Sequence, residues 1–129
     1  MGQALVKNDV SIIAGTDSNT AGVVAGFSLH DELESLKKTG MTNSQILHSA
    51  TVTPAQWMQS NGGKIKVGYR ADLILLEKNP LEEIKNTRTI NAVIANGKLI
   101  DRTELNKMLL SIKNANNRSR KVSIDKFIN

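Results

Sequence analysis

The short apolar run VSIIA, residues 10–14, constrains the fold of this chain more than any other feature. Its length and its β-branched residues favour a strand over a helix, and its nearly continuous apolarity predicts burial on both faces. The run stops at Gly15 and is followed by Thr16 and Asp17. A carboxylate at the end of such a strand either forms an Asx-type turn with its own backbone or is an acid held in place for chemistry. These residues alone leave both readings open.

A single strand that is buried on both faces needs parallel neighbours and covering helices. The remaining sequence contains no alternating series of strands and helices that could supply them. Helical patterns come directly after the run, and the few short strands that come later would leave open sheet edges. We therefore expect either a part of a larger fold or a subunit that completes its sheets with another chain.

Capping residues, glycine stops and apolar periodicity predict the other elements. Thr42 with Gln45 forms a capping-box pattern, and Thr53 before Pro54 repeats it, with the proline at the first helical position. Asn96-Gly97 is the best hairpin signal. The expected helices cover residues 28–40, 42–51, 53–61 and 103–113, and the expected strands cover 64–67, 72–77, 90–95 and 98–101.

The composition narrows the classes of function. The chain has 129 residues, a 40% apolar fraction and no cysteine, which suits one domain with a real core and excludes disulfides and thiolate metal cages. No apolar stretch approaches the roughly 20 residues of a membrane span, and a secretory pattern is missing, so we expect a cytoplasmic protein without membrane partners. The net charge of +5 concentrates near the C-terminal end, and the 3% of aromatic residues argues against nucleic acid as a partner.

Six short motifs occur in an order that resembles the C-terminal part of the metal-dependent amidohydrolases. They are GTDS at 15–18, an HxEL-type helix at 30–33, Gly-Met-Thr at 40–42, LHSATVTPA at 47–55, GGKIKVGYRADLILLEKNPL at 62–81 and VIANGKLID at 93–101. The imidazolonepropionase-like and Xaa-Pro dipeptidase-like members are the nearest in pattern. Each motif is weak alone, and their order over residues 10–101 makes the resemblance specific.

The resemblance implies an α/β fold class: the C-terminal fragment of a (β/α)8 hydrolase barrel with part of its small β-sandwich. Residues 1–63 would be the last barrel strand and its following helices, residues 64–101 a part of the sandwich, and residues 102–129 a C-terminal helix and basic tail. Barrel enzymes place reactive groups at the carboxyl ends of their strands, and Asp17 matches the family's aspartate at the end of the last strand. In the complete enzyme that aspartate would ligate a divalent metal, zinc by expectation, and take a proton from the attacking water. Gly15 would let the backbone turn tightly beneath the site.

His30 falls where family members can contact the substrate, although a partly exposed helical histidine without that role explains it as well. The family's HxH pair, its bridging lysine or glutamate and two later histidines do not occur here, and His48, on a predicted helix, is interpreted as structural. Because a catalytic zinc takes three protein ligands and a water, we expect this chain alone to bind no metal and to be inactive.

The complete enzyme is expected to hydrolyse a C–N bond in a small-molecule amide or cyclic amide by means of metal-activated water. The alternative is a non-catalytic interaction module that keeps the fold remnant and forms a homo-oligomer through its unpaired strands. A third hypothesis, nucleic-acid binding through the basic C-terminal end, is weaker because stacking aromatics are few.

Overall fold

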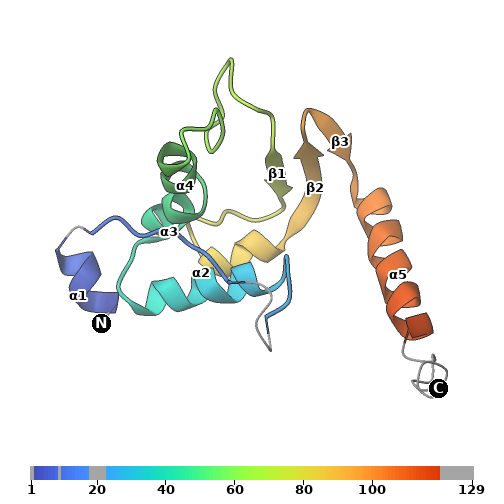
Figure 1. Cartoon of the computed structure of the whole chain (residues 1–129), viewed down its shortest axis with the longest axis horizontal. Helices are drawn as coiled ribbons and strands as arrows, with labels where there is room; N and C mark the ends of the chain where they lie inside the picture. Colours follow the sequence, from blue (N-terminus) through green and yellow to red (C-terminus); the bar gives the residue numbers. More distant parts are fainter. Residues whose placement is uncertain (1, 9, 18–22, 120–129) are drawn as a thin grey trace, which may run out of the picture.

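The computed structural model describes residues 2–8, 10–17 and 23–119, without the side chains of residues 117–119 (Figure 1). The elements in these ranges are α1 Gly2–Lys7, α2 Ser28–Lys38, α3 Asn43–Ala50, α4 Val52–Trp57, β1 Leu73–Leu76, the 3-10 helix η1 Ile84–Arg88, β2 Ile90–Ala95, β3 Lys98–Ile100 and α5 Arg102–Ser119. The chain is therefore an α/β unit in which helices precede a small sheet. Part of the expected loop after Asp17 and most of the basic tail lie outside the described residues. The division at residues 63/64 and 101/102 stays a prediction.

A small core joins α2 and α3 to η1. Leu33, Met41, Ile46 and Ile84 form a buried cluster, and Ile46 is fully inaccessible to solvent. The start of α3 is fixed by the predicted capping box, which confirms the sequence interpretation at Thr42. The Thr42 hydroxyl accepts the Gln45 N–H at 3.2 Å, and the Gln45 side chain accepts the Thr42 N–H at 2.8 Å.

The run at residues 10–14 is not a strand, so the prediction that opened the sequence interpretation is wrong for this chain. The described residues place no second strand beside it, and a strand needs a neighbour to satisfy its backbone groups. Burial is also one-sided: Ile12 and Ala14 pack against the core, whereas Val10 is 48% exposed and Ile13 42% exposed. The segment instead lies against the helices through one face.

The sheet has the strand order β1-β2-β3, and both pairs are antiparallel. This arrangement confirms the expected strands around LILL and INAVIA and the expected hairpin. Asn96 and Gly97 have φ values of 50° and 78°, the left-handed pair that a two-residue type I′ turn requires. In Figure 1, α3 and α4 lie on the β1 side of the sheet and α5 projects from the β3 side.

The expected strand at residues 64–67 is absent, and the chain there forms bends and a turn. Ile65 is 89% exposed and Val67 is 99% exposed, so the alternating pattern has no described surface to pack on. Alternation predicts a strand only where a neighbouring strand and a core are available, and the described residues offer neither at this point.

The second predicted helix cap is also wrong. α4 begins at Val52, has no side-chain cap, and contains Pro54 as its third residue, so Thr53 lies inside the helix. Thr51 ends α3 and at the same time precedes α4, which leaves no free turn for Thr53 to cap. The helix ends at Trp57, before the glycines that were expected to stop it.

Three helical features were not predicted at their observed positions. α1 and η1 were not expected at all, and α5 extends beyond residue 113 to Ser119. α5 begins at Arg102 because the Oδ1 atom of Asp101 accepts the Glu104 N–H at 2.8 Å, which makes Asp101 the cap in place of Thr103.

Within the described part of the chain, no helix has both the length and the hydropathy of a membrane span.

Candidate functional site

Asp17 stands at the end of the extended segment, and its side chain is exposed. Its φ of 48° lies in the left-handed region, which costs most residues energy but which aspartate tolerates better because its short side chain can hydrogen-bond locally. The left-handed turn therefore falls on Asp17 itself. Gly15, which was expected to provide it, has no positive φ, and a Cβ there would meet no atom within 4 Å.

Two hydrogen bonds fix the backbone just before this aspartate. The Ala14 N–H donates to the carbonyl of Ser49 in α3 at 2.9 Å, and the Gly15 N–H donates to Oε1 of Glu32 in α2 at 2.7 Å. Ser49 is itself buried, with its hydroxyl donating to the carbonyl of Ile46 at 2.7 Å. Helices α2 and α3 thus hold the segment where a parallel sheet was expected to hold it.

His30 occupies the first turn of α2 and is half-buried. Its Nδ1 lies 3.0 Å from Oγ1 of Thr87, whose hydroxyl donates to the carbonyl of Ile84 at 2.9 Å. Because that hydroxyl has only one proton, Nδ1 of His30 must be the donor, which leaves Nε2 as an acceptor in the neutral ring. Burial lowers the pKa of His30, and the positive charge of Arg88 lowers it further, against the opposing effect of nearby carboxylates. The ring is thus favoured in its neutral form.

A cavity of about 460 Å³ lies beside His30, between α2, β2 and α5. Phe27, Val93 and Leu105 contribute apolar surface to it, and Arg88 and Arg102 contribute cations. Arg88 already pairs with Asp31 and Glu34, at 2.6 and 3.0 Å. Asp17 is not among the lining residues, so the structure does not bring His30 and Asp17 into one cavity.

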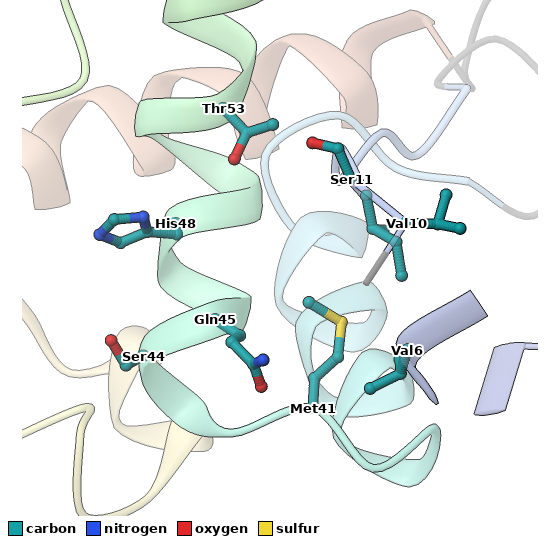
Figure 2. Close-up of a pocket in the computed structure, with 9 residues that line it drawn as sticks. Val6, Val10, Ser11, Met41, Ser44, Gln45, His48 and Thr53 are labelled. Carbon is teal, nitrogen blue, oxygen red and sulfur yellow. The ribbon is translucent and has the colours of Figure 1, made fainter. Parts of the chain in front are cut away.

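A second cavity, of about 400 Å³, lies between α1, the extended segment and α3 (Figure 2). Val6, Met41 and Gln45 line it together with His48, which is exposed and points away from Val6 in Figure 2. Among the described residues, no carboxylate lines this cavity. The structural role of His48 stays a prediction.

The described residues contain no group of three or more histidine, cysteine, aspartate or glutamate side chains that could hold a metal ion. Asp17 can supply one oxygen ligand, but a catalytic zinc takes three protein ligands. The described residues therefore do not make up a complete metal site.

The family model described as "Amidohydrolase family" matches residues 3–100, so the chain belongs to the amidohydrolase family. This finding confirms the resemblance seen in the motifs. Members of the family generally depend on a metal.

Among curated proteins, the chain is similar to ochratoxinase of Aspergillus niger, with 33% identity over 103 residues. The match covers 75% of this chain and 21% of that protein, so the chain spans about a fifth of the length of the curated relatives it matches.

Three solved structures are similar to this chain over 78% of its length and about a quarter of their own length. A Xaa-Pro dipeptidase with bound methionine in the active site has a TM-score of 0.68 at 29% identity. The Aspergillus niger ochratoxinase structure has a TM-score of 0.66 at 31% identity. Molinate hydrolase has a TM-score of 0.67 at 24% identity, which supports the fold alone.

Glu32 is the site residue that sequence reasoning missed. The motif at residues 30–33 drew attention to its histidine, yet the glutamate is the side chain that contacts the segment before Asp17. Its role depends on a contact between residues 17 positions apart, so no local pattern in the sequence could have found it.

Proposed function

We propose that this chain is the C-terminal portion of an amidohydrolase that hydrolyses C–N bonds in small amides or cyclic amides. The observation that carries the proposal is the family match over residues 3–100, in which Asp17 ends the segment that resembles the last barrel strand. The similarity to ochratoxinase and to a Xaa-Pro dipeptidase supports a hydrolase. We propose likewise that the complete enzyme folds as a (β/α)8 barrel with a small β-sandwich.

Within this proposal, Asp17 is the contribution of the chain to the active site. Its exposed carboxylate accepts the proton of the attacking water, which is general-base catalysis. In the complete enzyme Asp17 would also be one ligand of a divalent metal, zinc by expectation, whose other ligands would come from outside the described residues. His30, half-buried and favoured as a neutral ring with Nε2 as an acceptor, stays a candidate for substrate contact. The isolated chain is inactive.

A chimera tests this function. Residues 3–100 replace the matching segment of Aspergillus niger ochratoxinase, and hydrolysis of that enzyme's own substrate is measured. We expect activity in the chimera and a loss of about 100-fold or more in kcat for Asp17→Asn, the lower range of general acid–base contributions. Asp31→Asn, an exposed carboxylate on α2, is the matched control and should retain activity. A chimera that hydrolyses its substrate equally well with Asp17→Asn would refute the role of Asp17.

A second function, a non-catalytic module that forms a homo-oligomer, is favoured by the edges of the sheet. β1 and β3 each pair on one side only within the described sheet, and Ile74, Leu75 and Leu99 are 52–61% exposed. Open edges and apolar side chains favour association with another chain. Light scattering with metal content measured on the same sample separates the two functions. A discrete metal-free oligomer supports the module, and a metal-free folded monomer counts against it.

A further inference from the structure

Glu32 contacts the candidate catalytic segment from a different part of the chain. Its Oε1 atom accepts the Gly15 N–H at 2.7 Å, a short distance of the kind found in hydrogen bonds to charged groups. Gly15 precedes Asp17 by two residues. The bond joins α2 to the backbone that leads into the left-handed turn of Asp17.

The environment of Glu32 is costly for a residue with only a structural purpose. Its other carboxylate oxygen, Oε2, is buried and has no hydrogen-bond partner among the described residues. Within the same residues Glu32 forms no salt bridge, whereas Glu34 on the same helix pairs with Arg88 at 3.0 Å. A buried acceptor without a partner costs free energy, and more so when it is charged.

The backbone next to Gly15 shows what the bond achieves. The Ala14 N–H is held by the Ser49 carbonyl, so two successive amides are fixed by two different helices. Asp17 then follows in a left-handed conformation that an unrestrained chain seldom adopts. A short, charge-assisted anchor immediately before such a turn restricts the directions in which the Asp17 carboxylate can point.

We propose that Glu32 is a positioning residue, which holds the Gly15 amide and thereby sets the orientation of the Asp17 carboxylate. The inference rests on the proposed role of Asp17. Glu32 acts through the backbone and does not itself touch the reacting atoms.

The experiment follows individual resonances of the full 129-residue chain by NMR. In Glu32→Ala the exchange of the Gly15 amide with solvent should rise by about 10- to 100-fold, the equivalent of one hydrogen bond to a charged group. The Asp17 Cα and Cβ shifts, which report its left-handed backbone, should move towards unstructured values.

Two further variants make the result specific. Glu32→Gln keeps an oxygen acceptor and should retain the Gly15 protection and the Asp17 shifts in large part, whereas Glu34→Gln removes a carboxylate elsewhere on α2 and should leave both unchanged. If Glu32→Ala does not fold, Glu32→Gln gives the answer. Asp17 shifts that persist in folded Glu32→Ala, or Gly15 protection that is lost in Glu32→Gln, overturn the inference. Because no hydrolysis is measured, either outcome leaves the chimera assay of the proposed function undisturbed.

Discussion

The replacement of Ile46 by valine is the sharpest test of the core that supports the candidate site. Ile46 is fully buried, with 0% exposure, in the cluster with Leu33, Met41 and Ile84. The substitution removes one methylene group without adding a polar atom. Such changes in a buried position cost about 0.5–1.5 kcal/mol, since they lose transfer free energy and leave a small cavity. We expect a loss of about 1 kcal/mol in the free energy of unfolding.

Urea denaturation followed by helical circular dichroism measures this loss. With a denaturant slope of about 1.5 kcal/mol per molar urea, a loss of about 1 kcal/mol lowers the midpoint by about 0.7 M. The matched control is Ile65→Val, the same chemical change at a side chain that is 89% exposed, and it should shift the free energy by less than about 0.5 kcal/mol. Equal midpoints for the two variants would refute the argument, because the helical half would then lack the packed core described above.

Three further predictions concern the turn, the helix start and the pH dependence. Gly97→Ala should destabilise the chain by about 1 kcal/mol because the alanine is forced to a left-handed φ. Gly15→Ala, at a position with no positive φ and no atom within 4 Å of an added Cβ, should be tolerated. Thermal unfolding of both variants checks this, and equal losses of stability would contradict it. Thr42→Ala should remove about 1 kcal/mol of capping free energy, measured as a lower urea midpoint; an unchanged midpoint would show that the box does not contribute. Burial lowers the pKa of His30, so the stability contributed by its neutral ring is fully present above the ordinary value of 6.5 and is lost as the pH falls through the lowered folded pKa. His30→Gln should flatten the fall of Tm as the pH drops below 6.5, whereas His48→Gln, at an exposed position, should retain that fall.

Local signals in the sequence predicted the elements whose causes are themselves local. The capping box at Thr42 and the Asn96-Gly97 turn involve hydrogen bonds and backbone angles within four residues, so sequence spacing is sufficient to find them. The strands β1 and β2 could also be predicted from local signals, since turn residues bound their apolar runs.

Long-range causes explain the errors. The run at residues 10–14 and the alternating residues 64–67 have the composition of strands, but a strand forms only when another strand accepts its hydrogen bonds. The sequence interpretation at Thr53 failed for a different reason, because α3 and α4 share Thr51 at their junction and this junction depends on how the two helices pack. The family resemblance anticipated Asp17, whereas the role of Glu32 depends on a contact across 17 residues that no local pattern contains.

The geometry of Asp17 can therefore be understood as a property of the helices more than of the segment that carries it. A barrel strand is held by neighbouring strands on both sides, yet here the Ser49 carbonyl and the Glu32 carboxylate of two helices hold the backbone. The other side presents Ile13, an apolar side chain that is 42% exposed. Under the proposed function this exposed side is where the rest of the barrel packs, and the helical anchors keep the segment extended in its absence. The chimera and the NMR experiment address these two sides separately, because the first supplies the missing neighbours and the second removes one anchor.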